Sequence, residues 1–265
     1  MPADPKAKWR VRIALLVLFV FVIAASATAY FVADLGRLQD LIAARESQAA
    51  LQGITDAGQI AAALEQHPRN KFLRITAMAT AAADETNAAI EKLSGEVEPP
   101  AIAQAGNLGA ASRSDLEALR RDLKTAETNA AALTPRIAAI LKAERDKVED
   151  EAHSLYLEKD RSSRLLDQID SRHAETAAFT SRMSAARADF YRAYQSYVGL
   201  LIGEFGAYRV EGGQFIFPLK RTVDRYNAAA QAMTTAAQHV AQLDDEGKRL
   251  LASQQERWLQ FVRGE

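Results

Sequence analysis

The 265-residue chain contains no cysteine. This absence excludes disulfide bonds, thiolate metal sites, a cysteine nucleophile and a lipid-modified N-terminal cysteine. The chain also lacks an excess of positive charge, since its formal net charge is -1 at pH 7. A nucleic-acid-binding protein needs a basic surface to meet the phosphates, so we expect no nucleic acid among its partners.

Recognisable catalytic motifs are missing as well. The sequence has no glycine-rich phosphate loop behind a strand, no His-Glu-x-x-His helix and no serine in a nucleophile elbow. The histidines lie at scattered positions, which are His67, His153, His173 and His239. We therefore expect a protein that is not an enzyme and that uses no cofactor.

Two acid-x-x-His pairs are candidates for a metal site, Asp150 with His153 and Asp170 with His173. Paired motifs of this kind on facing helices can hold two metal ions in a four-helix bundle. The known pattern uses glutamate and needs further inward-facing carboxylates, whereas residues 144–164 are dense in charges of both signs. The sequence favours a solvated helix face with local ion pairs, and we predict no metal site.

Glycine is absent from residues 113–198, and Pro135 is the only proline in that interval. Such a composition is typical of long helices. Ser114 with Glu117 predicts a capping box at the start of the first helix. Thr134 before Pro135 predicts either an N-cap followed by proline at the first helical position, or a proline kink.

Charge is missing from Ile13 to Ala33, a continuous apolar run behind a basic tail. At about 1.5 Å per residue this run covers the ~30 Å hydrocarbon core of a bilayer, which predicts one transmembrane helix. The excess of Lys and Arg before the run predicts a cytoplasmic N-terminus. The residues expected at the membrane interfaces are Lys6, Lys8, Trp9, Arg10, Arg12 and Tyr30.

A cleaved secretory signal is the alternative, because Ala27 to Ala29 has the small-x-small form of a cleavage site. Against cleavage after Ala29, the apolar run continues through Val32, whereas a cleaved signal usually turns polar at this point. Both alternatives place the rest of the chain outside the cytoplasm. We expect a single-pass inner-membrane protein with a periplasmic C-terminal domain.

Beyond the anchor, helical spacing predicts an all-α fold built as an antiparallel bundle of long helices. The expected divisions are a cytoplasmic tail at 1–12, a transmembrane signal anchor at 13–33, a juxtamembrane helical region at 34–94, a linker at 95–112 and a periplasmic helical bundle at 113–265. The linker is rich in proline and glycine. It either separates two helical units or crosses over a bundle.

Caps and apolar spacing predict individual helices. The juxtamembrane region starts with a stalk at 34–52, and Asp56 with Gln59 resembles a capping box for a short helix ending near Gln66. Residues 69–94 form the next predicted helix. At the C-terminus we predict two helices, 218–241 and 245–262, with Asp244 as the N-cap of the second.

Apolar residues recur every three or four positions from Leu166 to Leu201, close to a heptad seam. Arg172 and His173 interrupt this seam. The interruption favours a bundle partner within the same chain over a long two-stranded coiled coil, with a homodimer through the seam as the alternative.

Residues 199–218 are the most distinctive stretch after the anchor. Tyr208 and Val210 precede a Glu-Gly-Gly turn, and Phe215 and Phe217 follow it. This alternation around a Gly-Gly pair predicts a short β-hairpin near 207–217. The alternative is an aromatic plug that tucks back into the bundle. We name Tyr208, Val210, Phe215 and Phe217 as candidate contacts with a partner.

The stretch from Tyr208 to Asn227 (YRVEGGQFIFPLKRTVDRYN), with the alanine- and glutamine-rich helix after it, supports one resemblance. It resembles the C-terminal part of a family of small enterobacterial envelope lipoproteins of unknown function, which carry a Gly, Phe-Pro and Tyr-Asn arrangement after a helical region. This chain departs from the family in lacking the lipidated cysteine and in having a peptide anchor instead. The resemblance implies an envelope location and nothing catalytic.

Together these patterns predict a non-enzymatic membrane protein whose periplasmic bundle binds another envelope protein or a second copy of itself. The alternative is a ligand-sensing bundle that signals through a membrane partner. A tail of twelve residues is too short to hold an output domain of its own.

Overall fold

The computed structural model describes residue 51 and the segments 53–98 and 108–264. The tail at 1–12, the predicted anchor at 13–33 with its interface residues, and nearly all of the predicted stalk lie outside the described residues. Within the described part of the chain, no helix combines the length and the apolar character needed to cross a bilayer.

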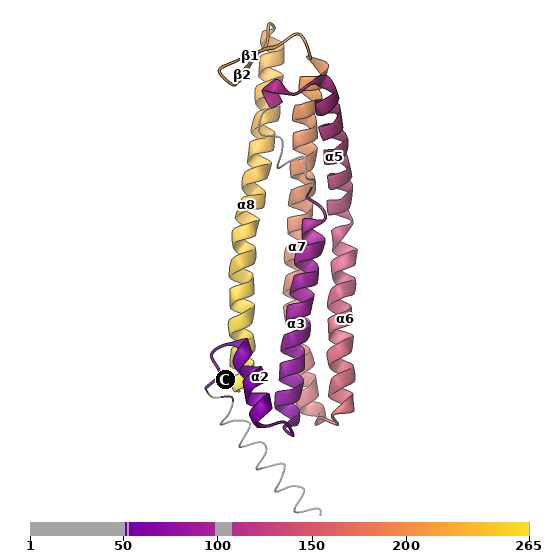
Figure 1. Ribbon diagram of the computed structural model, residues 1–265, viewed down its shortest axis with the longest axis vertical. Coiled ribbons are helices and arrows are strands. Elements are labelled where there is room, and N and C mark those ends of the chain that lie inside the picture. Colours follow the sequence, from indigo (N-terminus) through magenta and orange to yellow (C-terminus); the bar gives the residue numbers. More distant parts are fainter. Residues whose placement is uncertain (1–50, 52, 99–107, 265) are drawn as a thin grey trace, which may run out of the picture.

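The described elements form a bundle of long helices with one small sheet (Figure 1). In chain order they are α2 (Ala57–Gln66), α3 (Lys71–Gly95), the 3₁₀ turn η1 (Leu108–Ala110), α5 (Arg113–Ala131), α6 (Leu133–Ser154), α7 (Lys159–Gly203), β1 (Arg209–Glu211), β2 (Gln214–Ile216) and α8 (Lys220–Arg263). The predicted all-α fold is confirmed, and so is the predicted hairpin.

The bundle is a rod whose two ends are different (Figure 1). α5 and α6 follow each other in one line, α7 returns along them, and α8 runs back antiparallel to α7. The hairpin of β1 and β2 lies at one end, whereas α2 and the end of α8 lie at the other. α3 packs along α6 and stops short of the hairpin end, so fewer helices build that end.

Local caps explain where the first two helices begin. The Asp56 carboxylate accepts a hydrogen bond from the backbone N–H of Gln59 at 3.1 Å, which confirms the predicted N-cap of α2. The Gln59 side chain reaches back to the backbone N–H of Thr55 at 2.8 Å, one residue earlier than in a standard capping box. Asn70 caps α3 by accepting from the backbone N–H groups of Phe72 and Leu73.

The capping box of α5 forms two residues earlier than predicted. Ser112 is the N-cap, and its hydroxyl accepts from the Asp115 backbone N–H at 3.2 Å. The Asp115 carboxylate accepts from the Ser112 hydroxyl and backbone, and these hydrogen bonds lower its pKa. Ser114 and Glu117 already lie inside the helix, because the extended backbone that a cap requires occurs at Ser112.

The junction of α5 and α6 is a tight break at Ala132, which caps both helices without a side-chain hydrogen bond. Thr134 is therefore not an N-cap. Pro135 is the third residue of α6, and it has no N–H to donate to the carbonyl one turn earlier. Because the chain breaks at Ala132, the missing hydrogen bond falls in the first turn of α6, where backbone N–H groups have no partner within the helix. The two helices continue in nearly one line (Figure 1).

The predicted break at Asp244 is wrong, because α8 is one helix of 44 residues. Asp244 lies in its interior, and the neighbouring Asp245 accepts a hydrogen bond from Lys248 within the helix at 2.9 Å. No proline interrupts this part of the chain. Gly247 stays helical with the Phe179 ring packed against it, since a Cβ there would lie 2.7 Å from a ring atom.

Two hydrophobic cores lie toward the two ends of the rod. The core near the hairpin joins the end of α3, α5, the first half of α6, the second half of α7 and Phe217. The opposite core joins residues 51–82 with the end of α6, the start of α7 and the end of α8. Residues on both sides of the 95–112 segment thus share each core. The Trp258 indole N–H, for example, donates to the Thr80 hydroxyl at 3.0 Å.

Candidate functional site

The hairpin at the end of the bundle is fixed by a turn that only glycine forms easily. Val210 pairs with Phe215, and Glu211 pairs with Gln214, in an antiparallel register. The two residues between the strands, Gly212 and Gly213, have φ angles of 59° and 79°. A two-residue turn with positive φ at both positions matches the twist of the strands, which is why the Gly-Gly pair identifies it from sequence.

One face of the hairpin packs on the bundle through aromatic rings. The ring centroids of Tyr208 and Phe217 lie 5.6 Å apart, and those of Phe217 and Tyr226 lie 5.0 Å apart. The Tyr226 hydroxyl lies 3.0 Å from that of Tyr197 on α7. Burial, together with this contact, raises the pKa of Tyr197. The two alternatives for this stretch are therefore combined, since a hairpin forms and its rings tuck into the bundle.

The four candidate contact residues differ in exposure. Phe217 is 7% exposed and belongs to the core, while Tyr208 and Phe215 are half-buried. Val210 is 38% exposed, and Ile216, which sequence reasoning did not single out, is 39% exposed. Side chains alternate between the two faces of a strand, so Ile216 lies on the face opposite Phe215 and Phe217. The alternation of side chains along a strand is the sequence signal that could have identified Ile216.

Large exposed apolar side chains gather around this hairpin. We call the group formed by Phe205, Val210, Ile216 and Leu219 the hairpin patch. Leu219 is 63% exposed and Phe205 is 40% exposed. The other large exposed apolar residues of the described chain are Tyr156 and Leu251. Such grouping is more informative than single exposed apolar residues, which are common on any protein surface.

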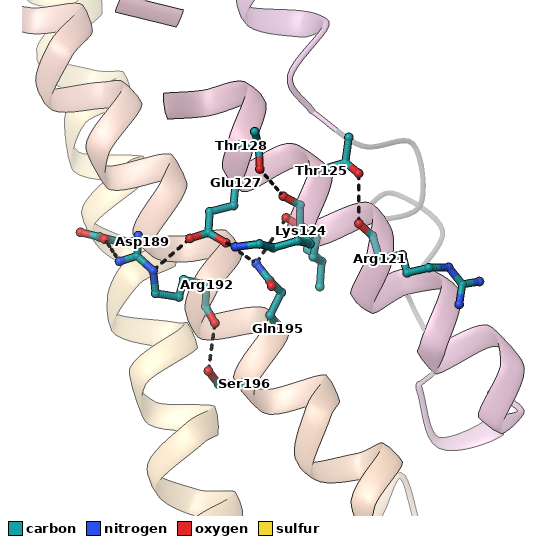
Figure 2. A network of polar contacts seen from close by, with 10 residues as sticks. Arg121, Lys124, Thr125, Glu127, Thr128, Asp189, Arg192, Gln195 and Ser196 are labelled. Carbon is teal, nitrogen blue, oxygen red and sulfur yellow. Dashed lines mark hydrogen bonds and ion pairs between the residues drawn. The ribbon is translucent and has the colours of Figure 1, made fainter. Parts of the chain in front are cut away.

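Further down the rod, a polar network ties α5 to α7 (Figure 2). The Glu127 carboxylate of α5 accepts hydrogen bonds from Lys124 at 2.9 Å, from Gln195 at 3.0 Å and from Arg192 at 3.1 Å. The bond from Lys124, followed by that from Gln195, lowers the pKa of Glu127 to about 2. Two of these donors lie on α7, so the network fixes the register of the two helices that support the hairpin.

A second polar group, which is buried, lies between the two cores. Glu144 of α6 is 4% exposed, and its carboxylate meets the guanidinium of Arg172 and lies 3.2 Å from His173 Nε2. Burial opposes ionisation of Glu144, but the hydrogen bond from His173 and the charge of Arg172 outweigh it, and the pKa is lowered. The predicted solvated face at residues 144–164 is therefore wrong at its first residue, Glu144, which is buried. It also explains why Arg172 and His173 interrupt the seam.

The two acid-x-x-His pairs do not come together. Asp170 accepts a hydrogen bond from Arg145 at 2.9 Å, whereas His173 lies against Glu144. In the part of the chain that the structure describes, no group of three or more His, Cys, Asp or Glu side chains could hold a metal ion.

Comparison of the chain with protein-family models, with curated proteins and with solved structures found no match. The resemblance of Tyr208 to Asn227 to envelope lipoproteins therefore stays a prediction.

Proposed function

We propose that this protein is a non-enzymatic, single-pass membrane protein that presents the hairpin end of its helical bundle to a protein partner in the cell envelope. The observation that carries this proposal is the hairpin patch, a group of exposed apolar side chains on and beside a hairpin that packs on the bundle through its aromatic rings. Grouped apolar side chains on a surface mark contact sites, because water leaves them when a partner binds.

The support beneath the patch suits binding. A flexible loop loses conformational entropy when it binds, whereas a pre-organised one loses less. Here the glycine turn sets the backbone of the hairpin, the aromatic rings fix it to α7 and α8, and the Glu127 network holds α5 on α7. The patch is thus presented on a rigid platform.

The arrangement of the ends fits a membrane anchor at 13–33. Residue 51 belongs to the core at the end opposite the hairpin, so an anchor preceding it would leave the hairpin farthest from the bilayer (Figure 1). α7 has 45 residues, and at ~1.5 Å per residue it spans about 70 Å. An inner-membrane anchor would therefore hold the patch deep in the periplasm, within reach of a second envelope component.

Site-specific photocrosslinking of the full-length protein in its native membrane tests the proposal. A photoreactive residue at position 216 should give a discrete product with a partner protein, and the same residue at position 156 should not. Tyr156 is the matched control, because it is 87% exposed but follows α6, far from the hairpin. Equal products from both positions, or products from position 156 alone, would exclude the hairpin as the contact.

A double substitution gives the corresponding prediction. With the photoreactive residue kept at position 216, Val210→Lys with Leu219→Lys should abolish the crosslinked product. The free energy of unfolding should change by no more than about 0.5 kcal/mol, as is usual for surface positions. Lysine is tolerated on exposed strand edges. A product that persists with full yield would place the contact elsewhere.

A further inference from the structure

A cavity of about 580 Å³ opens in the middle of the rod, between α3, α6, α7 and α8. We call it the mid-bundle cavity. Volumes of this size accommodate small molecules. It is separate from the hairpin patch, and an inference drawn from it does not rest on the proposed partner contact.

Apolar side chains from three of the helices form part of the cavity wall, between polar residues such as Thr180 and Ser184. Ile90 of α3, Ile137 of α6, and Phe179 and Met183 of α7 contribute to it. At the end toward α2, Gln254 and Thr176 line the cavity, but Gln254 already donates to the Thr176 hydroxyl at 3.3 Å and to Glu175 at 3.2 Å. These polar groups already form hydrogen bonds within the protein, so a ligand at this end does not need polar atoms to satisfy them.

The opposite end holds Arg187, which makes no ion pair with another described residue. Arg187 is half-buried and donates one hydrogen bond, to the Ser94 carbonyl at 3.2 Å. In the described segments no carboxylate lies within ion-pairing distance of its guanidinium, whereas seven other arginines of α6, α7 and α8 make such pairs: Arg136, Arg145, Arg161, Arg172, Arg182, Arg192 and Arg257. The charged residues at the rim, Glu91, Asp244 and Lys248, are exposed. A half-buried cation at the end of an apolar cavity favours an anionic group beside it.

The shape of the cavity limits the rest of the ligand. Its α7 lining extends from Thr176 to Arg187, which at ~1.5 Å per residue is a length of about 16 Å. A long, partly apolar space with a half-buried cation at one end matches an extended hydrocarbon chain with one acidic head. We propose that the mid-bundle cavity binds a medium-chain fatty acid, with its carboxylate on Arg187 and its chain between Ile90, Ile137 and Phe179.

The test uses dodecanoate carrying a diazirine on its chain, added to the full-length protein in phospholipid nanodiscs. After irradiation, the labelled peptides are mapped by mass spectrometry. Labelling should fall on peptides that line the cavity, should be displaced by free dodecanoate and should resist dodecanol, which has the chain without the charge. Labelling confined to residues 13–33, or displaced equally by dodecanol, would overturn the proposal.

Three variants sharpen the result. Arg187→Gln removes the charge and should weaken labelling about tenfold or more, the usual worth of a hydrogen bond to a charged group. Arg164→Gln is the control, because Arg164 is an exposed arginine of α7 that does not line the cavity. Ser184→Leu fills the cavity from a buried position and should block labelling with Arg187 intact. Unchanged labelling in Arg187→Gln or in Ser184→Leu would contradict the proposal, and circular dichroism checks that each variant is folded.

Discussion

Phe217 connects the hairpin to the core, since its ring stacks with Phe215 and tilts against Tyr226. Because it is only 7% exposed, Phe217→Ala should lower the free energy of unfolding by about 3 kcal/mol, within the range for large-to-small core changes. Urea denaturation measures this loss. The matched change Val210→Ala, at a position 38% exposed, should shift it by no more than about 0.5 kcal/mol. Similar losses in both variants would mean that Phe217 is not a core residue.

The buried carboxylate of Glu144 makes stability depend on pH. Its pKa is lowered in the folded state below the ordinary value of 4.5, so its contribution is present above about pH 4.5 and is lost as the pH falls through the lower folded value. Glu144→Ala leaves Arg172 half-buried without its partner and should lower the free energy of unfolding by about 3 kcal/mol at pH 7.

The measurement is urea unfolding of the Glu144→Ala variant and the unchanged protein at several pH values from 7 to 3. The gap between the two proteins should narrow as the pH falls. A gap that stays constant would show that Glu144 is not ionised in the folded protein. Glu127 titrates in the same direction in both proteins, so its effect cancels in the comparison.

At the scale of elements, Gly247 allows α8 to pass over the Phe179 ring of α7. Glycine inside a helix is usually less stable than alanine by about 1 kcal/mol, but a Cβ at Gly247 would lie 2.7 Å from that ring. We therefore expect Gly247→Ala to bring no gain by itself, and to become stabilising when Phe179→Leu is also present. A double-mutant cycle measured by urea denaturation should give a coupling of about 1 kcal/mol.

The control for this cycle is Gly203→Ala at the end of α7, where a Cβ would meet nothing within 4 Å. That change should behave the same with or without Phe179→Leu. A coupling at Gly203 as large as that at Gly247 would remove the steric explanation.

The elements that sequence predicted well are those specified by neighbouring residues. The Asp56 cap and the Gly-Gly turn depend on groups a few positions apart, so their patterns could be recognised directly. The break predicted at Asp244 failed because a potential cap residue is also compatible with a helix interior, and the contacts of the helix decide between the two. The burial of Glu144 depends on α7, which pairs with it from a distant part of the sequence.

The same distinction applies to the candidate site. The sequence located the hairpin and its aromatic residues, because alternation and glycine are local signals. It could not tell which face turns to the bundle, since that depends on Tyr226 and Tyr197 from the two long helices. Nor could it find the mid-bundle cavity, whose wall comes from four separate helices.

At the scale of the whole molecule, the segment of α8 before Leu243 is less buried than the neighbouring part of α7. Between Thr222 and Leu243 it has no buried residue, whereas α7 has many from Thr180 to Leu201. Few buried contacts allow local opening at low free energy. Hydrogen exchange followed by mass spectrometry should therefore show faster exchange at 234–242, beyond the α8 residues that pack on the hairpin-end core, than at 188–201. Equal protection of the two segments would mean that α8 opens only together with the rest of the bundle.

The shared core at the end opposite the hairpin has a practical consequence for labelling. Leu51 and Val262 both belong to this core, so the chain enters and leaves the described bundle at the same end. A fluorescent protein fused behind α8 would stand beside the entry of the chain and clear of the hairpin. Paired with a dye at Ile216, it would form an energy-transfer ruler along the rod, and a bend or a collapse of the bundle would appear as a change in transfer efficiency.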